Sequence, residues 1–247
     1  MANIPLISII TVVYNGIHSI KGTILSVISQ SYKNIEFIVI DGGSSDGTID
    51  IITEYRDHIT FWASEKDTGI YNAMNKGIQK ANGDWICFLN SGDTFVNTDT
   101  VSNVVREINK ISESIEIIYG NILIRTQNGN YKEKVAKEPC NLQRMHFCHQ
   151  SAFVKSNLLK KYLFDETYKL SADLKFFKQC FYDNHQSIHL NFPVVIYDTE
   201  GISNTNRQAG LKENIEIIKE IDKGLNKFLF LIRLYFVIYW RKLTGKK

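Results

Sequence analysis

The first 110 residues alternate between short β-branched apolar runs and segments with helical spacing. Strands are predicted at residues 6–14, 35–40, 59–63 and 85–89, because each apolar run is short and bounded by turn residues. Helices are predicted at residues 17–31, 48–56 and 69–81, with Ser45 or Asp46 as N-cap of the second. Alternating strands and helices form right-handed βαβ units. The sequence therefore predicts an α/β fold with a mostly parallel, doubly wound sheet and helices on both faces.

The pattern changes after residue 110. Residues 115–125 and 131–136 flank Gln127-Asn-Gly-Asn130 and predict an antiparallel hairpin. Further helices are predicted at 151–163, 171–183 and 211–221, and a further strand at 187–197. Internal repeats and low-complexity linkers are absent from the sequence. We therefore expect one domain over residues 1–222, followed by a basic segment at residues 223–247.

The formal net charge of +3 is distributed unevenly along the chain. From Lys223 to Lys247 there are five lysines, two arginines and no acid. The rest of the chain is consequently slightly acidic. This distribution argues against a general nucleic-acid-binding protein.

The cysteines predict a reducing environment. Cys87, Cys140, Cys148 and Cys180 lie far apart without a CxxC pair, and Cys87 lies inside an apolar run that would bury it as a free thiol. We expect a cytoplasmic protein without a zinc site. Residues 1–5 are too short and too polar to act as a signal peptide.

Polar residues follow two of the predicted strands, at the sheet edge where open α/β folds bind ligands. Asp41 could accept hydrogen bonds from a base or ribose, and Gly42 and Gly43 would let backbone amides approach a ligand. Alternatively, this glycine-rich turn only connects a strand to a helix. Asp93 could bind Mg²⁺ or Mn²⁺ together with a diphosphate, or it could cap a helix that begins near Thr98.

Two further candidates lie in the second half of the chain. Asp173 lies in a predicted helix with apolar neighbours, where a shielded carboxylate could act as a general base. A lone acid on a helix is more often solvated or a cap. His149 is a further candidate, but a histidine in this position is more often a core or hydrogen-bonded residue.

Residues 225–240 are dense in Leu, Phe, Ile and Tyr but contain Lys227 and Arg233. The run is short for a membrane span of roughly twenty residues. Its aromatic residues and the flanking Arg241 and Lys242 favour an amphipathic helix that lies in the plane of an anionic membrane surface. The alternative is a helix packed on the domain or on a partner subunit.

Several motifs occur in an order typical of one enzyme family. They are residues 8–15, Asp41-Gly-Gly-Ser-Ser-Asp-Gly-Thr48, residues 65–77, Asn90-Ser-Gly-Asp93, Cys148-His-Gln-Ser151, Leu170-Ser-Ala-Asp173 and residues 201–204. Together they resemble the family-2 glycosyltransferases, inverting enzymes with the GT-A fold. The resemblance implies a nucleotide-binding half at residues 1–110 and an acceptor half at residues 111–222.

The resemblance also implies roles for single residues. Asp93 would bind Mg²⁺ or Mn²⁺, Asp173 would be the general base, and His149 and Gln150 would lie on the acceptor side. The nucleotide-sugar would be contacted by Thr11, Val13, Asn15, Asp41, Gly43, Asp67, Asn72, Asn75, Lys76, Asn90 and Ser91.

The motifs depart from the family pattern at four positions. Asn90 and Gly92 stand where the metal-binding DXD motif has acids. Ala172 replaces the glutamate before the catalytic aspartate, and Lys175 stands where related sequences often have an acid.

The expected function is inverting transfer of a sugar from a UDP-sugar to a polyprenyl-diphosphate-linked oligosaccharide. It would take place on the cytoplasmic face of a bacterial inner membrane, in O-antigen or capsule synthesis. One alternative is a binding module that has lost turnover. The other is a nucleotidyltransferase, which would need a basic glycine-rich loop where this chain has Tyr14-Asn-Gly-Ile-His18.

Overall fold

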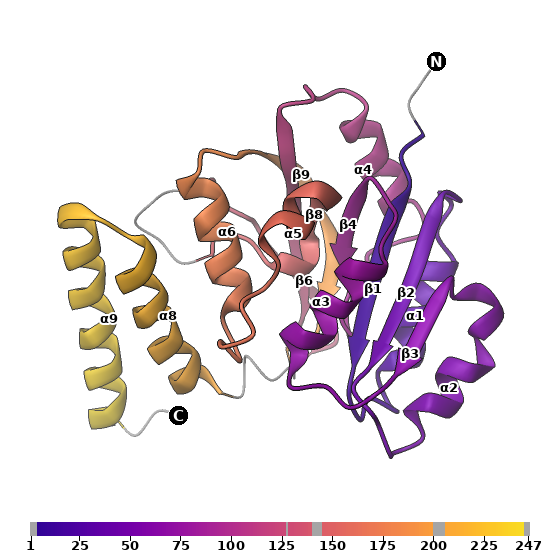
Figure 1. The fold of residues 1–247 in the computed structure, drawn as a ribbon, viewed down its shortest axis with the longest axis horizontal. Helices are drawn as coiled ribbons and strands as arrows, with labels where there is room; N and C mark the ends of the chain where they lie inside the picture. The colour runs from indigo at the N-terminus through magenta and orange to yellow at the C-terminus, as the bar shows by residue number, and fades with distance from the viewer. Residues whose placement is uncertain (1–3, 127, 140–144, 200–205, 245–247) are drawn as a thin grey trace.

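The computed structural model describes residues 4–126, 128–139, 145–199 and 206–244. Its sheet has the strand order β3 (Phe61–Ser64), β2 (Ile35–Asp41), β1 (Ile7–Val13), β4 (Trp85–Phe88), β8 (Ala152–Lys155), β6 (Ile115–Arg125), β9 (Gln186–Tyr197) and β5 (Thr94–Phe95), and β7 (Tyr131–Lys134) pairs with β6. The four parallel strands of the first half are β1 (Ile7–Val13), β2 (Ile35–Asp41), β3 (Phe61–Ser64) and β4 (Trp85–Phe88). All four therefore end at the same edge of the sheet (Figure 1). The α/β fold predicted from the alternating pattern is confirmed.

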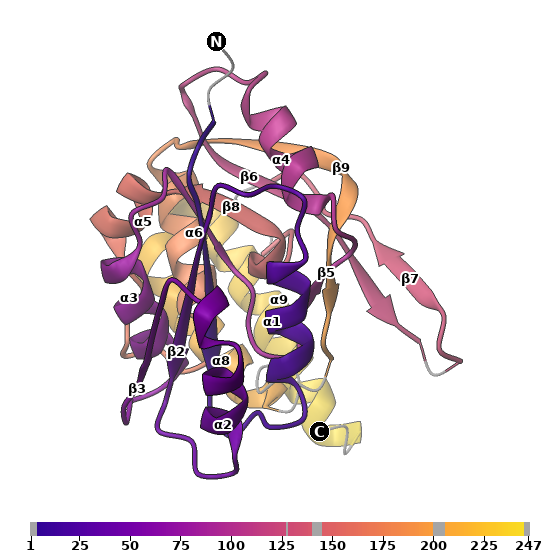
Figure 2. The same cartoon turned by 90° about the vertical axis from the view of Figure 1, so that its right-hand side faces the viewer.

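Helices cover both faces of this sheet, as predicted. One face packs against α1 (Ile20–Ile28), α2 (Thr48–Glu54) and α4 (Thr100–Ile108). The other packs against α3 (Ile70–Lys80), α5 (Ser156–Tyr162) and α6 (Ala172–Tyr182). Figure 2 shows α1 and α4 on one side of the strands and α3 and α5 on the other. Because strand side chains alternate between faces, the near-continuous apolar runs of β1 and β2 supply both cores.

The second half adds strands of mixed direction. In this half β6 (Ile115–Arg125) pairs antiparallel with β7 (Tyr131–Lys134), which confirms the predicted hairpin, and parallel with β9 (Gln186–Tyr197). The hairpin projects from the body of the molecule in Figure 2. A short strand β5 (Thr94–Phe95) pairs with the end of β9, and a 3₁₀ turn η1 (Arg56–His58) follows α2.

The helix predicted at residues 151–163 is wrong over its first part. Ala152–Lys155 forms β8, which lies between β4 and β6 and is antiparallel to both. Only Ser156–Tyr162 is helical, and a 3₁₀ turn η2 (His149–Ser151) precedes the strand. Ala152, Phe153 and Val154 are buried. A short apolar run of this kind fits a buried strand or a buried helix equally well, and here the two neighbouring strands decide.

The last two helices form an antiparallel pair beyond α6, at the opposite end of the molecule from β3 (Figure 1). They are α8 (Arg207–Ile221) and α9 (Gly224–Thr244). Phe230 and Leu234 of α9 are buried against Leu211, Ile215 and Ile218 of α8. Within the described residues, α9 included, we find no helix with the length and apolarity needed to cross a bilayer.

Candidate active site

The loops that follow β1, β2 and β4 are bonded to one another at the carboxyl edge of the sheet. The Asn15 amide donates to Ser44 Oγ at 2.7 Å, and the Ile17 amide donates to Asp46 Oδ2 at 3.0 Å. Ser19 Oγ and Ser91 Oγ lie 2.7 Å apart. These bonds hold the three loops as one rim, and Asn15 and Ser91 both take part in it.

Asp41 organises the turn after β2. Its carboxylate is fully buried. The oxygens accept bonds from the amides of Gly43 and Ser44 at 3.0 and 2.9 Å and from the hydroxyls of Ser44 and Ser64. The side chain thus fixes the loop whose backbone faces the rim, and direct contact between Asp41 and a nucleotide stays a prediction.

The sequence predicts Ser45 or Asp46 as the N-cap of α2. The N-cap is instead Gly47, with φ of 99°. Asp46 instead accepts bonds from the amide and hydroxyl of Thr48. Gly43 has φ of 84°, and a Cβ there would lie 3.3 Å from the Lys66 amide nitrogen. A Cβ on Gly42 would lie 2.4 Å from Asp67 Oδ2, so the carboxylate of Asp67 closes over this turn. Gly43 and Asp67 therefore both lie at this turn, and their contact with a nucleotide-sugar stays a prediction.

Thr11 and Val13 lie within β1 and are buried. The Thr11 hydroxyl donates to the Leu89 carbonyl at 2.7 Å and so ties β1 to the end of β4. Both side chains lie beneath the rim, and contact between these residues and a nucleotide stays a prediction.

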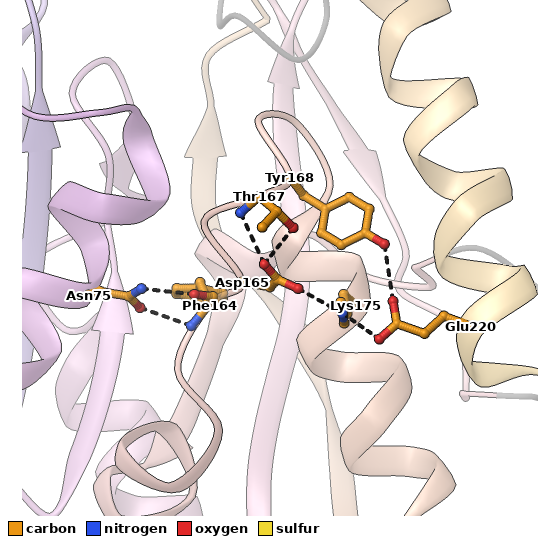
Figure 3. Close-up of polar contacts among 7 residues, drawn as sticks. All are labelled: Asn75, Phe164, Asp165, Thr167, Tyr168, Lys175 and Glu220. Atoms are coloured by element: carbon orange, nitrogen blue, oxygen red, sulfur yellow. Dashed lines mark hydrogen bonds and ion pairs between the residues drawn. The ribbon is translucent and has the colours of Figure 1, made fainter.

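Asn72, Asn75 and Lys76 on α3 bond to protein groups rather than to open space. Asn75 exchanges two bonds with the Phe164 backbone, at 2.8 and 2.9 Å, as Figure 3 shows. Asn72 and Asn75 both donate to Glu166, and Lys76 pairs with Glu65 at 2.7 Å. These contacts make α3 the support of the loop between α5 and α6, and the predicted donor-sugar contacts of the three residues stay untested.

Asp93 is buried beside the end of β9. Its Oδ1 accepts a bond from the Asp198 amide at 2.9 Å, and the helix expected near Thr98 begins at Thr100 with Asp99 as N-cap. Asp93 therefore does not cap that helix. Burial raises the pKa of Asp93 to about 7, with repulsion from Asp198 adding to the effect and bonds from the Asp198 amide and the Gln150 side chain opposing it. Gln150, expected on the acceptor side, thus lies against Asp93 and is itself buried.

Asn90, His149, Asp173 and Tyr71 form a continuous row across the site. His149 Nδ1 lies 3.0 Å from Asp173 Oδ2, and the Tyr71 hydroxyl donates to Asp173 Oδ1 at 2.8 Å. On the other side of the imidazole, His149 Nε2 lies 3.4 Å from Asn90 Nδ2. The structure thus brings together the predicted base, the predicted acceptor-side histidine and the strand end of β4.

The helix that carries Asp173 is held in place by Lys175. Its ammonium group pairs with Asp165 at 2.7 Å and with Glu220 of α8 at 2.6 Å. Tyr168 also donates to Glu220, and Thr167 donates to Asp165, as Figure 3 shows. Lys175 therefore points away from Asp173, toward α8, and its place in the motif is explained by this network.

Two hydrogen bonds in the candidate site could not be predicted from the sequence. Tyr71 and Asp173 are 102 positions apart, and Asp93 and Asp198 are 105 apart. Tyr71 lies in a motif that the sequence singles out, but no local signal points to its partner. The predicted loop at residues 201–204 and Cys140 lie outside the described residues, whereas Cys87 is buried as a free thiol, as expected.

The groups that could bind a metal ion are the oxygens around Asp93. In the described part of the chain no three His, Cys, Asp or Glu residues come together as a metal site. Asn90 Oδ1, in the same turn as Asp93, is buried without a hydrogen-bond partner. An orphaned oxygen near a carboxylate suits a hard divalent cation that takes its remaining ligands from water and a diphosphate.

The fold is similar to those of two solved structures that contain a nucleotide-sugar. The S. aureus protein TarS in complex with UDP-GlcNAc matches with a TM-score of 0.71 and 17% identity, covering 93% of this chain and 71% of that one. A mannosyltransferase from Pyrobaculum calidifontis in complex with GDP-Man and Mn²⁺ matches with a TM-score of 0.68 and 15% identity, covering 95% and 69%. The architecture is therefore that of the GT-A glycosyltransferases.

The sequence comparisons define the family. The pattern of glycosyl transferase family 2 matches residues 8–168. An uncharacterized glycosyltransferase of Mycobacterium tuberculosis is 39% identical over 109 residues, which cover 44% of this chain but only 42% of that relative. A PGL/p-HBAD biosynthesis glycosyltransferase of Mycobacterium bovis is 28% identical over 181 residues, covering 72% and 70%. This chain belongs to glycosyl transferase family 2.

Proposed function

We propose that this protein transfers a sugar from a UDP-sugar to a hydroxyl group, with inversion at the anomeric carbon. The observation that carries the proposal is the convergence at one sheet edge of the Asp41 turn, Asp93 and the Asp173–His149 pair. Ligands bind at this edge in open α/β sheets. The UDP-GlcNAc and GDP-Man complexes of the structural neighbours agree with a nucleotide-sugar donor.

Each group has a role in this reaction. The backbone of the turn held by Asp41 would receive the nucleotide, since glycines at positions 42 and 43 leave its amides open to close approach. The Asp173–His149 pair would accept the proton of the attacking hydroxyl. The row from Asn90 to Tyr71 would fix the acceptor between the donor sugar and that pair.

Asp93 and Asn90 would hold Mg²⁺ or Mn²⁺. The raised pKa of Asp93, the charge of Asp198 beside it and the orphaned Asn90 oxygen support this assignment, because a cation would relieve all three. When bound, the ion would neutralise charge that develops on the leaving diphosphate.

We further propose that α9 lies on an anionic membrane surface. Its outward face exposes large apolar side chains at helical spacing, over roughly 27 Å at 1.5 Å per residue: Leu225, Phe228, Leu229, Ile232, Tyr235, Phe236, Tyr239, Trp240 and Leu243. The segment that contains this face is basic and has no acid. Apolar burial, aromatic anchors and attraction to anionic lipid would act together on such a helix.

A membrane position would place the enzyme beside a lipid-linked acceptor. We infer a polyprenyl-diphosphate-linked oligosaccharide at the cytoplasmic face of a bacterial inner membrane, in the synthesis of a surface polysaccharide such as O-antigen or capsule. The bovine mycobacterial relative is named for the biosynthesis of PGL/p-HBAD.

The test is a panel of nucleotide-sugars, followed by thermal unfolding and by release of free nucleotide, with and without Mn²⁺. Binding raises the unfolding midpoint, so a UDP-sugar should stabilise the protein, and Mn²⁺ should increase the shift. Asp93→Ala should lose the Mn²⁺-dependent part and keep the rest. A panel in which no nucleotide-sugar shifts the midpoint or releases nucleotide would contradict the proposal. Binding without release would favour the non-catalytic module.

A further inference from the structure

Tyr71 extends from the first turn of α3 to the start of α6. Its hydroxyl donates to Asp173 Oδ1 at 2.8 Å, and 5% of the residue is exposed. The ring packs against Phe164, with the two ring centroids 5.5 Å apart. Phe164 is itself held by the two bonds between its backbone and Asn75. Close packing therefore leaves the tyrosine ring little room to move, and its hydroxyl keeps one position beside Asp173.

Asp173 is held by contacts from two different elements. It lies in the first turn of α6, and its side chain is 16% exposed. Oδ1 accepts the bond from Tyr71 of α3, and Oδ2 lies 3.0 Å from His149 Nδ1 of η2. A carboxylate has about four acceptor sites, so Asp173 can still receive the hydroxyl of an acceptor. The two contacts therefore fix the orientation of the carboxylate without blocking it.

A chain of contacts connects Tyr71 with the turn after β2. Asp67 Oδ2 lies over Gly42 in that turn and fills the place that a Cβ on Gly42 would take. Asp67 Oδ1 accepts a bond from the Gly69 amide at 2.9 Å, and Gly69 is the N-cap of α3. Tyr71 is the second residue of that helix. The position of its hydroxyl is therefore tied to the turn that would receive the nucleotide.

The bond from Tyr71 to Asp173 joins the two halves of the site. Tyr71 belongs to the half of the chain that contains the nucleotide turn, and Asp173 belongs to the other half. Transfer requires a fixed distance between the acceptor hydroxyl, the base and the anomeric carbon, and a displacement of about 1 Å can lower the rate about a hundredfold. A bond between the halves would hold the base at the correct distance from the donor.

We propose that Tyr71 is a positioning residue, whose hydroxyl holds the Asp173 carboxylate in place relative to the donor sugar. This inference rests on the proposed transferase function. Asp173 takes the proton of the acceptor hydroxyl, whose oxygen forms a bond to the anomeric carbon. The bond from that carbon to the diphosphate breaks, and its electron pair leaves with the diphosphate. Tyr71 gives up no proton, since burial and the charge of Asp173 raise the pKa of its hydroxyl well above the usual value.

A second tyrosine provides a matched control on the same helix. The Tyr162 hydroxyl donates to Asp183 Oδ2 at 2.8 Å, which is also the length of the bond from Tyr71. Asp183 is the C-cap of α6, at the end of the helix away from Asp173. If the Tyr71 bond only helped to pack α6, loss of either hydroxyl should have the same effect on turnover.

The first experiment needs no substrate. NMR of protein labelled at the tyrosine ring carbon that bears the hydroxyl reports the surroundings of each hydroxyl, and Tyr71→Phe identifies the Tyr71 signal. We expect Asp173→Asn, which removes the carboxylate charge, to shift this signal. Asp183→Asn should shift the signal of Tyr162 instead. A Tyr71 signal that is identical in the wild type and in Asp173→Asn overturns the proposal whether or not the protein is a transferase.

The second experiment measures UDP release from UDP-GlcNAc, with water as the acceptor, in the presence of Mn²⁺. If the wild type releases no UDP from it, the UDP-sugar that the panel identifies replaces it. Tyr71→Phe should lower kcat roughly 10- to 100-fold with little change in KM, because it displaces the base and leaves the donor site intact. Tyr162→Phe should leave both constants close to those of the wild type.

A double-mutant cycle, measured at high enzyme concentration, separates positioning from packing. Because Tyr71 acts through the base, Tyr71→Phe should lower kcat much less in the Asp173→Asn background than in the wild type. An equal loss in the two backgrounds would overturn the proposal. A wild-type kcat in Tyr71→Phe, or an equal loss in Tyr162→Phe, would do the same.

Failure of this inference can be distinguished from failure of the proposed function. A wild type that releases nucleotide from no sugar of the panel refutes the proposed function, and the role of Tyr71 falls with it even where the tyrosine spectra confirm the bond. An active wild type in which Tyr71→Phe gives any of the contrary results refutes the role of Tyr71 alone.

Discussion

The residues at this sheet edge are of two kinds. Some are buried and stabilise the loops, and others are partly exposed to the site. Asp41 is fully buried and accepts bonds from its own turn and from Ser64 of β3, whereas His149 and Asp173 keep part of their surface open. Sequence motifs do not distinguish these two kinds of residue, because a residue that stabilises a loop and a residue that is exposed to the site can be neighbours in one motif.

Gly43→Ala should destabilise the protein by about 1–2 kcal/mol, because an alanine at φ of 84° is strained and its Cβ would lie 3.3 Å from the Lys66 nitrogen. Urea unfolding measures the change. Gly22→Ala is the matched control, since Gly22 lies in α1 with no atom within 4 Å of a new Cβ. It should stabilise by roughly 0.5–1 kcal/mol. Equal effects of both changes would contradict the strain argument.

Asp93→Asn should change how stability depends on pH in metal-free buffer. The folded pKa of Asp93, about 7, lies above its ordinary value of 3.8, so ionisation costs stability as pH rises between those values. The wild type should therefore lose up to about 4 kcal/mol relative to Asp93→Asn between pH 4 and pH 8. Urea unfolding across this range, with EDTA present, is the measurement. Parallel curves for the two proteins would show that Asp93 is ionised normally.

At the scale of elements, the loop between α5 and α6 joins the two halves of the molecule. Asn75 holds it to α3, and Lys175 holds it and α6 to α8 through Asp165 and Glu220 (Figure 3). The side chain of Lys175 is 20% exposed, so its two ion pairs are less screened than those of the surface. The position of Asp173 on α6 therefore depends on contacts made two residues further along the helix.

Lys175→Met should destabilise the protein by about 1–3 kcal/mol, since it leaves Asp165 and Glu220 without their cation. The pKa of Asp165, now about 2, should rise toward its ordinary value, so the stability that it supplies at neutral pH should shrink. Lys110→Met is the control, because its pair with Glu107 is exposed and worth at most about 1 kcal/mol. Denaturant unfolding at neutral and acid pH compares the three proteins, and equal losses in both variants would contradict this role.

At the scale of the whole molecule, α9 lies on α8 and exposes its other face. The packed side holds Phe230 and Leu234, so deleting α9 would uncover the apolar side of α8. Substitutions on the outward face avoid that complication. Phe236 and Trp240 stack on each other there and are 62% and 57% exposed.

Phe236→Glu with Trp240→Glu should abolish sedimentation with phosphatidylglycerol vesicles, to which the wild type should bind, because two charges replace aromatic anchors. The control is Tyr131→Glu with Val135→Glu, which adds the same charge at the exposed hairpin and should leave vesicle binding nearly intact. Equal losses in both variants, or a wild type that forms dimers through α9 and ignores vesicles, would refute the membrane assignment.

The sequence by itself determined the order and type of nearly all elements, because helical and strand periodicities are local. It failed at Ala152–Lys155, where four residues are too few to distinguish the two periods and the neighbouring strands β4 and β6 decide. It also marked Asp93, His149 and Asp173 through their motifs. Only the tertiary structure decided which of these groups touch, because the bonds from Tyr71 to Asp173 and from Asp198 to Asp93 join residues more than 100 positions apart. Burial and hydrogen bonding, which set the proton affinities of these groups, exist only once the chain has folded around them.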